Sequence, residues 1–577
     1  MAQSDARFGY RARLGRTDHD LNQPFGFTCP PGMLCPIWFD FATPGDSYYM
    51  KHDLPILRSI QLLSPMMTDV KVHFETFFVP IQMLYQPAEN ALTKIANLQS
   101  SSYGQSIVVE GMDFPLFNFD EYLHVMQDVS LVDSYFADIY RMIEFFGLGS
   151  YNYRGFDESL PPVPNMANYL PSFFPWQILA YHTIFEYYYR LDDKSQFAND
   201  NCNWDKFMGS SVATLPNADF MQLHQRPWDF DYFTSMYRSP LVSNANMQSL
   251  LRGKAYSSLN AAWEYPLDVF SNVSSLNSDI TSFGINPAST GNGELNSVVI
   301  RTLFANEKLA MITGRARKNY DSQILAHYGV DVPHDVKHDI TMIHHDTYDL
   351  NVMEVTSLAS TSDAPLGELA GKSFSHGNGK EFKFTAPVHG VVMTIFSIEP
   401  KRRYLTGFDR INSVVSTEDL PIPEYDRLGN VPMFRYETCP LNGATMSNII
   451  GWKERYYQFK RKMPKVTMAF YTANGKNNYS SFLINTVPFG TVTGTDTSVY
   501  SSTLSRPDAE NRFYIDRRSM DSQCALQWIG SWQHDDDGEN WFKTPWLVYA
   551  RDPFIVDSHI KCKKVSWMSK DGEPIYD

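Results

Sequence analysis

The sequence predicts a mainly β protein with long ordered loops and a few helices, and three observations favour this class. The 577 residues include 39 Phe, 33 Tyr and 11 Trp, and aromatic residues are typical of strands and broad packed surfaces. The chain also holds 34 Pro and 32 Gly, which favour turns over long helices. The segments with strand character lie far apart, so a sheet built from them must be closed by non-local pairing.

The first 42 residues predict an extended basic arm. Arg7, Arg11, Arg13 and Arg16 are interleaved with aromatic residues, and four prolines between positions 24 and 36 keep the following chain extended. We expect no regular element in the first forty residues.

The clearest strand is predicted at residues 70–80, where apolar and polar residues alternate until Pro80 ends the pattern. The alternation places Val70, Val72, Phe74 and Thr76 on the side that faces the core. Similar β-branched or aromatic runs predict further strands at 390–398, 465–471, 546–550 and 554–565.

Two helices are predicted between these strands. Apolar residues at three- and four-residue spacing after Pro175 predict a helix over 176–190. A second helix is predicted over 301–328, where Gly329 supplies the stop. Between them, residues 271–299 contain seven Ser and five Asn, a composition that builds no core and predicts a long exposed excursion.

Charge, cysteines and motifs exclude several classes of protein. The net charge of −15 repels nucleic acid, so any contact with it must come from a local basic patch. Six scattered cysteines without a CxxC pair indicate neither a disulfide framework nor a zinc site. We find no signal-peptide pattern and no long apolar run, and expect folding in a reducing cytoplasm without a membrane anchor.

Enzymatic motifs are also missing, so we expect no enzyme and no cofactor. Residues 367–373 come nearest to a phosphate-binding loop, but three residues instead of four separate the two glycines. His334, His338, His344, His345 and Asp346 form a histidine cluster. A metal pair there would need a helix, which Pro333 and the strand-like surroundings disfavour, so we expect no metal and favour solvated or interface histidines.

Two basic segments are candidates for nucleic-acid binding. The arm combines Arg7, Arg11, Arg13 and Arg16 with aromatic residues, and these can neutralise phosphates and stack on bases. The second segment, 452–465, holds Lys460, Arg461 and Lys462 among several aromatic residues. The alternative for this segment is a solvated face whose aromatic residues belong to the core.

Separated blocks of the sequence resemble the major capsid protein of microviruses, small icosahedral bacteriophages with single-stranded DNA, and in particular the gokushovirus branch. The similar blocks, in order along the chain, are 43–47 (TPGDS) with 63–80, 228–235 (WDFDYFTS), 315–330 ending in His327-Tyr328-Gly329, 451–456 (GWKERY) and 552–557 (DPFIVD). The resemblance spans most of the chain, except that residues 95–175 form a longer stretch than is usual.

The resemblance implies an eight-stranded antiparallel jelly roll of the viral capsid type over residues 43–577, with a helix-containing insertion at about 95–225 and a surface protrusion at about 237–299. Sixty copies would form a closed icosahedral shell around circular single-stranded DNA. Trp263, Tyr265 and Phe270 are the candidates for packing three copies together or for contact with a host receptor.

The implied partners are a small basic DNA-binding protein, a scaffolding protein, a DNA pilot protein and a bacterial surface receptor. The implied location is the virion, with assembly in the cytoplasm of the host bacterium. A different class remains open, because a jelly-roll carbohydrate-binding protein or hydrolase would show similar aromatic residues and loops.

Overall fold

The structure is a computed structural model of the chain. Apart from isolated positions and very short pieces, it describes residues 16–59, 69–86, 114–117, 141–148, 173–190, 223–237, 339–356, 369–401, 408–414, 417–423, 430–434, 449–466 and 554–568.

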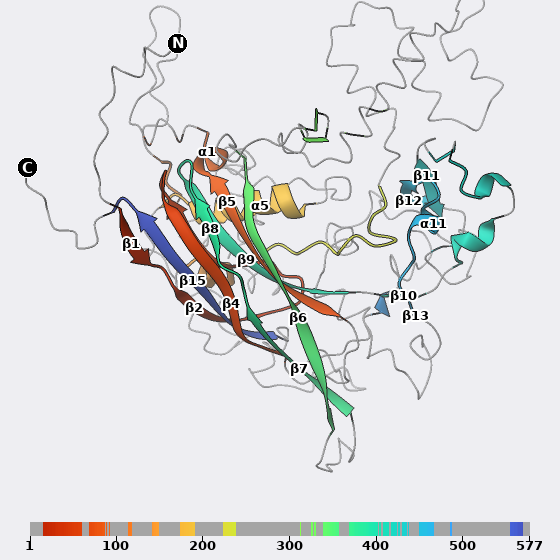
Figure 1. Ribbon diagram of the computed structural model, residues 1–577, viewed down its shortest axis with the longest axis horizontal. Helices are drawn as coiled ribbons and strands as arrows, with labels where there is room; N and C mark the ends of the chain where they lie inside the picture. The colour runs from red at the N-terminus through yellow and green to blue at the C-terminus, as the bar shows by residue number, and fades with distance from the viewer. Residues whose placement is uncertain are drawn as a thin grey trace, which may run out of the picture.

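A ten-stranded sheet dominates the described part of the chain (Figure 1). Its main order is β1-β15-β4-β7-β6-β5-β9-β3, with β2 paired to β15 and β8 paired to β4, and every pairing is antiparallel. The strands are β1 (Thr17–Asp20), β2 (Gln23–Cys29), β3 (Cys35–Ala42), β4 (Ser47–Ser59), β5 (Val70–Pro80), β6 (Thr341–Thr356), β7 (Leu369–Asn378), β8 (Phe382–Thr385), β9 (Gly390–Pro400) and β15 (Phe554–Ser566).

The sheet folds back on itself, so that β4, β8 and β15 face β5 and β9. Strands that are not neighbours in the sheet touch through their side chains: the rings of Phe78 on β5 and Phe384 on β8 lie 5.1 Å apart. His52 on β4 reaches Thr76 on β5, with 2.8 Å between Nε2 and Oγ1. The long strand β6 joins the two facing halves, because it pairs with β5 along its first part and with β7 along its last. The main hydrophobic core fills the space between the halves.

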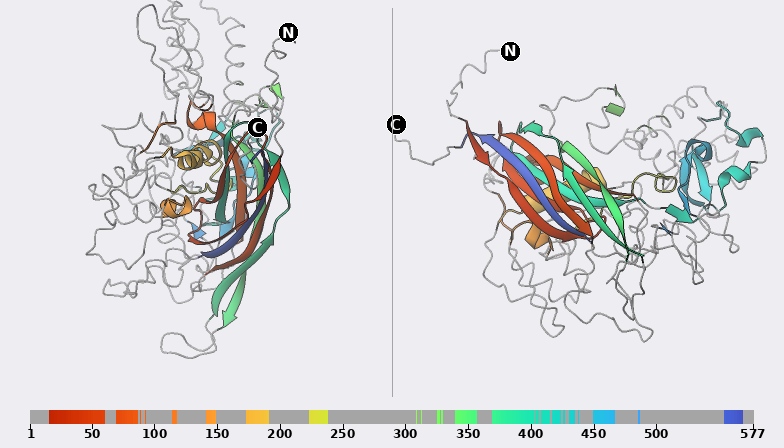
Figure 2. Two further views of the ribbon diagram at one scale, coloured as in Figure 1. Left: turned by 90° about the vertical axis from the view of Figure 1, so that its left-hand side faces the viewer. Right: turned by 60° about the horizontal axis from the view of Figure 1, so that its bottom comes forward.

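Helices cover the outer side of β5 and β9 (Figure 2). They are α1 (Ile81–Leu84), α5 (Trp176–Ile184) and the π-helical turn η2 (Phe185–Tyr189). Tyr188 of η2 packs on Phe77 of β5, with ring centroids 4.9 Å apart. Residues on both faces of β5 are therefore buried.

A smaller part lies beside the sheet and has its own hydrophobic cluster (Figure 1). It contains the hairpin of β11 (Asn430–Phe434) and β12 (Ile449–Glu454), followed by the short helix α11 (Tyr457–Lys460). Two 3-10 turns, η6 (Arg410–Ser413) and η7 (Thr417–Asp419), precede the hairpin. A three-stranded parallel sheet combines β10 (Arg403–Leu405), β13 (Lys465–Val466) and β14 (Asn485–Thr486).

Three predicted strands are confirmed, as β5, β9 and β15. Val70, Val72, Phe74 and Thr76 are buried on the predicted core side. Of the strand predicted at 465–471, the described residues contain only β13, and the strand predicted at 546–550 lies outside the described residues. The mainly β class with antiparallel pairing is thus correct.

The expectation of no regular element in the first forty residues is wrong for residues 17–42, where β1, β2 and β3 lie. Strands accept proline at edges and bulges, where the missing N–H removes no ladder bond. Pro24 pairs at the outer strand β2, and Pro36 sits where the register of β3 against β9 shifts. Pro24 and Pro36 therefore mark strand positions, whereas Pro30 and Pro31 lie in the turn between β2 and β3.

The helix predicted over 176–190 is confirmed, although its last turn widens into the π-helical η2. Most of the helix predicted over 301–328 lies outside the described residues. Gly329 has a φ of 68° and donates its N–H to the carbonyl of Leu325, which is the expected stop. No helix among the described residues is long and apolar enough to cross a membrane.

Candidate functional site

A buried ionic centre joins β5, β9 and the 223–237 segment. The guanidinium of Arg226 lies 2.8 Å from Glu75 Oε2 and 3.2 Å from Glu399 Oε2. Burial alone would raise the pKa of Glu75, but the Arg226 charge and its hydrogen bonds hold that pKa below its usual value. Tyr189 donates its hydroxyl proton to Glu75 as well. The centre fastens a loop and the helical layer to the sheet.

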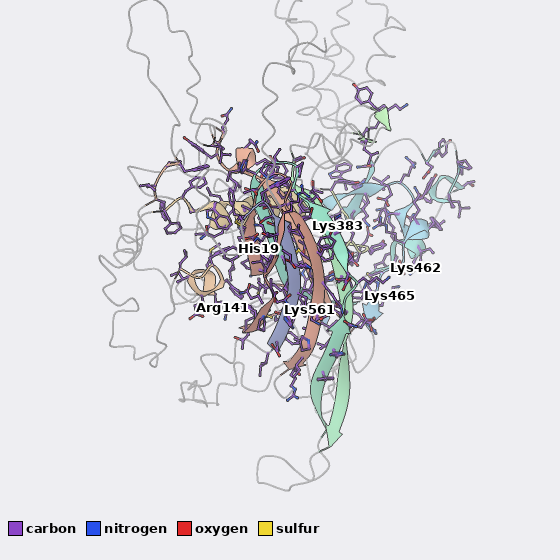
Figure 3. The ribbon with its side chains drawn as sticks, turned by 60° about the vertical axis from the view of Figure 1, so that its left-hand side comes forward. His19, Arg141, Lys383, Lys462, Lys465 and Lys561 are labelled. Atoms are coloured by element: carbon purple, nitrogen blue, oxygen red, sulfur yellow. The ribbon has the colours of Figure 1, made fainter. Side chains whose placement is uncertain are left out.

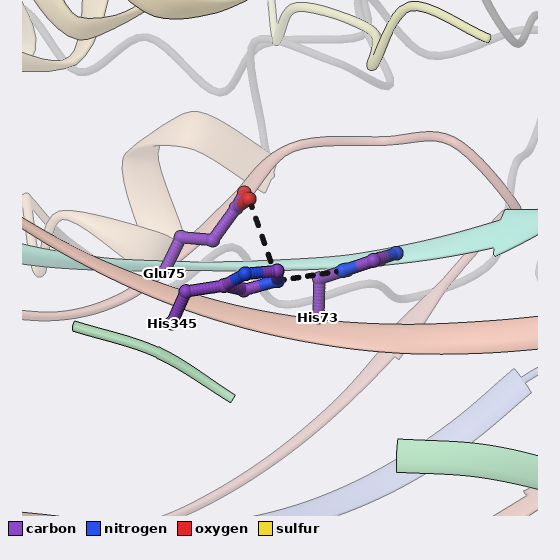
Figure 4. A group of neighbouring side chains, drawn as sticks. All are labelled: His73, Glu75 and His345. Atoms are coloured by element: carbon purple, nitrogen blue, oxygen red, sulfur yellow. Dashed lines mark hydrogen bonds and ion pairs between the residues drawn. The ribbon is translucent and has the colours of Figure 1, made fainter. Parts of the chain in front are cut away.

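Histidines from β5 and β6 extend this centre toward solvent (Figure 4). His73 Nδ1 lies 2.9 Å from His345 Nε2, and His73 Nε2 lies 2.9 Å from Glu399 Oε2. On the other face of β6, Asp346 pairs with the buried His52 at 2.9 Å. The predicted histidine cluster is therefore divided between two faces of a strand, and His334 and His338 lie outside the described residues.

Two of the sequence blocks that carry the resemblance meet in space. Tyr237, just after the 228–235 block, exchanges backbone hydrogen bonds of 2.7 and 2.9 Å with Trp452 of the 451–456 block. Gly451 packs so closely on Met236 that a Cβ there would lie 2.4 Å from the sulfur. Residues more than two hundred positions apart thus form one unit.

The centre of this unit is polar and buried. Tyr457 donates its hydroxyl to Glu437, which also pairs with Arg410 at 3.3 Å. Lys453 is fully buried, with its ammonium 5.0 Å from the Tyr232 ring centroid, and Nζ makes no hydrogen bond within the described part of the chain. Burial lowers the pKa of Lys453 to about 8.

A family model described as capsid protein (F protein) matches residues 11–112 and 147–486 of the chain. The match covers most of the sequence and includes both meeting blocks. The chain belongs to the microvirus major capsid protein family. A search of curated proteins found no match to it. Membership implies a structural role, assembly into a shell of many copies and a place in the virion.

The second basic segment of this capsid protein is largely neutralised by carboxylates. Lys460 pairs with Asp426, Arg461 Nε lies 3.9 Å from Glu454, and Lys465 pairs with Asp409. Lys462 is exposed near the β11–β12 hairpin (Figure 3). The neighbouring Tyr457 belongs to the second hydrophobic cluster. This agrees with the alternative given for the segment, in which its aromatic residues belong to the core.

Little of the arm falls within the described residues. Arg16 stacks its guanidinium 4.3 Å from the ring centroid of Trp567, next to the turn at Gly45. Arg7, Arg11 and Arg13 lie outside the described residues, as do the protrusion candidates Trp263, Tyr265 and Phe270.

A lysine-bearing sheet face was missed by the sequence analysis. This face carries Lys51 on β4, Lys383 on β8, and Lys561 and Lys563 on β15. Lys51 is the direct partner of Lys561, and Tyr49 of β4 is the direct partner of both Lys383 and Lys563. Figure 3 labels Lys383 and Lys561. Two carboxylates contact these lysines: Asp53 contacts Lys51 and Lys561, and Asp18 contacts Lys563. Lys383 lies 5.1 Å from the Tyr49 ring centroid. In the sequence, Lys561 and Lys563 alternate with residues that are buried in β15, and this alternation could have predicted the lysine-bearing face.

Proposed function

We propose that sixty copies of this capsid protein form a T=1 icosahedral shell around a circular single-stranded DNA genome. The observation that carries the proposal is the family match. The matched residues include strands from both facing halves of the sheet and the β11–β12 hairpin. Closed shells require each subunit to repeat the same contacts around symmetry axes. The abundance of aromatic residues suits such interfaces.

The proposed fold of the subunit is the eight-stranded jelly roll of viral capsids. Support comes from the two facing halves, in which β4 and β15 lie opposite β5 and β9 although they are distant in the sheet order. Strands from the beginning and the end of the chain alternate in the sheet, which is the kind of long-range pairing that jelly rolls use.

The genome would contact local basic groups, because the net charge of −15 opposes nonspecific DNA binding. The lysine-bearing sheet face and the arm arginines are the proposed contacts. A small basic DNA-binding protein would neutralise further phosphates. A scaffolding protein and a DNA pilot protein complete the proposed assembly partners, in the cytoplasm of a bacterial host.

Host attachment is assigned in this proposal to the insertion at about 237–299. Its Ser- and Asn-rich part offers many hydrogen-bonding groups, and Trp263, Tyr265 and Phe270 would anchor contacts between copies or with a receptor. Residues 113–146, which the family model leaves unmatched, fall within the other proposed insertion, 95–225.

Co-expression with the phage partner proteins, followed by sedimentation and electron microscopy, tests the proposal. A megadalton, icosahedral particle containing nuclease-protected circular single-stranded DNA is the expected result. A monomer or small oligomer that binds or hydrolyses carbohydrate would overturn it in favour of the jelly-roll carbohydrate-binding protein or hydrolase.

A further inference from the structure

Three side chains capable of binding a metal converge on the outer face of β5 and β6 (Figure 4). They belong to His73, Glu75 and His345, and their ligand atoms all lie within 4.8 Å of one another. His73 Nδ1 and His345 Nε2 are 2.9 Å apart, and His345 Nε2 is 3.7 Å from Glu75 Oε1. The group includes the two ligand types, imidazole and carboxylate, that bind zinc.

The register of the sheet produces this convergence. Glu75 of β5 is the direct antiparallel partner of His345 of β6, so their side chains point to the same face. His73 lies two residues before Glu75 and shares that face, because side chains alternate along a strand. Two rigid paired strands therefore supply all three groups, and no loop has to order for them to meet.

A carboxylate behind His73 prepares its ring for a metal. His73 Nε2 lies 2.9 Å from Glu399 Oε2 on the neighbouring strand β9. The negative charge of Glu399 favours the proton on Nε2, which leaves the lone pair on Nδ1, the nitrogen that lies 2.9 Å from His345 Nε2. Metal-binding histidines are commonly oriented by such a second carboxylate.

The charge balance also favours a cation. Glu75 and Glu399 carry two negative charges, whereas Arg226 supplies one fixed positive charge to both. Arg226 approaches Glu75 more closely at Oε2, at 2.8 Å, than at Oε1, at 3.3 Å. Tyr189 also donates to Oε2. Oε1 is consequently the oxygen left to face His345.

We propose that His73 Nδ1, His345 Nε2 and Glu75 Oε1 bind one zinc ion, with water at the fourth position. Tetrahedral zinc with nitrogens at about 2.0–2.1 Å separates two imidazole nitrogens by about 3.3 Å, so His345 must withdraw by only a few tenths of an ångström. The His345 side chain is 39% exposed and can make this shift, which also opens the path by which the ion enters. Calcium and magnesium, which prefer oxygen ligands, are disfavoured by the two imidazoles.

The bound ion would cross-link β5 to β6, and β6 is the strand that joins the two facing halves of the sheet. A ligand that binds only the folded chain stabilises it by mass action, so zinc should raise the melting temperature. The inference concerns the individual subunit and does not depend on the proposed T=1 shell.

The test uses full-length protein without a histidine tag. Zinc content after equilibrium dialysis at micromolar free zinc should approach one ion per chain, and excess calcium should not displace it. Cobalt(II) in place of zinc should give the visible absorption of a tetrahedral site. A wild-type protein that binds neither zinc nor cobalt overturns the proposal.

Variants test whether the ion binds at His73, Glu75 and His345. His345→Ala should lose zinc, the cobalt spectrum and the zinc-dependent rise in melting temperature, while His376→Ala, which removes an exposed histidine on β7, should retain all three. His345→Gln provides a second version in case the alanine variant folds poorly. Zinc binding by folded His345→Ala or His345→Gln at the wild-type level would place any ion elsewhere and refute the site.

Discussion

The ring of Phe74 on β5 packs edge-on against that of Phe396 on β9, with centroids 5.1 Å apart and planes inclined by 77°. The two residues are direct partners in the sheet, and both are fully buried. Phe27 of β2 contacts Phe396 from the opposite half at 5.2 Å. This aromatic group therefore holds the two halves of the sheet together.

Replacing Phe74 with alanine should destabilise the chain by about 3–5 kcal/mol, the usual cost of removing a buried phenylalanine ring. Urea unfolding of the unassembled protein measures the change. Phe374→Ala on β7 is the matched control, since Phe374 is 40% exposed and should change stability far less. Equal stability of Phe74→Ala and wild type would show that the ring does not fill the core between the halves.

Replacing Arg226 with methionine should cost about 3–5 kcal/mol, because Glu75 and Glu399 would remain buried without their cation. Unfolding free energies measure this loss. Arg58→Met, which removes an exposed arginine on β4, serves as the control. Adding Glu75→Gln and Glu399→Gln to Arg226→Met should restore part of the stability. A loss that stays the same in the triple variant would contradict the charge explanation.

Replacing Lys453 with methionine should stabilise the protein near pH 7 by up to about 3 kcal/mol, the equivalent of lowering its pKa from 10.5 to about 8. Below pH 8, both the folded and the unfolded chains carry the proton, and the burial penalty is fully present. Between about pH 8 and 10.5 the folded chain releases the proton first, so wild-type stability rises with pH.

The measurement is the urea midpoint at pH 7 and at pH 10. The wild type should gain stability relative to Lys453→Met over this interval, whereas Lys462→Met, at an exposed lysine, should follow the wild type. Parallel pH profiles for wild type and Lys453→Met would mean that the Lys453 ammonium is solvated in the folded protein.

Replacing Lys383, Lys561 and Lys563 with alanine should weaken binding of single-stranded DNA and reduce the slope of log K against log salt by about 2, since each phosphate contact contributes about 0.7. Fluorescence anisotropy across a salt series measures the slope. The comparison variant replaces Lys460, Arg461 and Lys465 of the second basic segment, which lies outside the proposed DNA-contacting face and should affect the slope less. The reverse ranking would assign the DNA contact to the hairpin part.

Deleting residues 271–296 should leave closed, DNA-filled particles that no longer adsorb to host cells, because this Ser- and Asn-rich stretch is expected to add little to the core. Particle yield, packaged DNA and cell adsorption are the three measurements. Trp263→Ala, with the stretch retained, tests the anchor separately. Normal adsorption by the deleted particles would remove the receptor role from this segment.

Local sequence patterns predicted the parts of the fold that depend on residues close together in the sequence. The alternation in 70–80 gave β5 and its buried side, and the spacing after Pro175 gave α5. The strands between 17 and 42 were not predicted, because a proline in an outer strand and a proline in an irregular chain look alike in sequence. Only the partner strand, β15 or β9, distinguishes them.

The candidate sites were predictable to a smaller extent for the same reason. Glu75, Arg226 and Glu399 are each more than 150 positions from the next, so their ion pairs depend on the complete sheet. His345 was noticed within its local cluster, but its partner His73 comes from a different strand. The similar blocks 228–235 and 451–456 were recognised separately, and only the folded chain shows that they touch.

The position of β15 also sets the time at which the subunit can finish folding. Cys562 of this strand donates its backbone N–H to the side chain of Asn22, 540 residues earlier, and β15 lies between β1 and β4 in the sheet. At roughly 5–20 residues per second, ribosomes need about half a minute to two minutes to make that interval. Until then β2 lacks its partner strand and β4 lacks one of its partners, so a nascent chain cannot complete the sheet before β15 has been made.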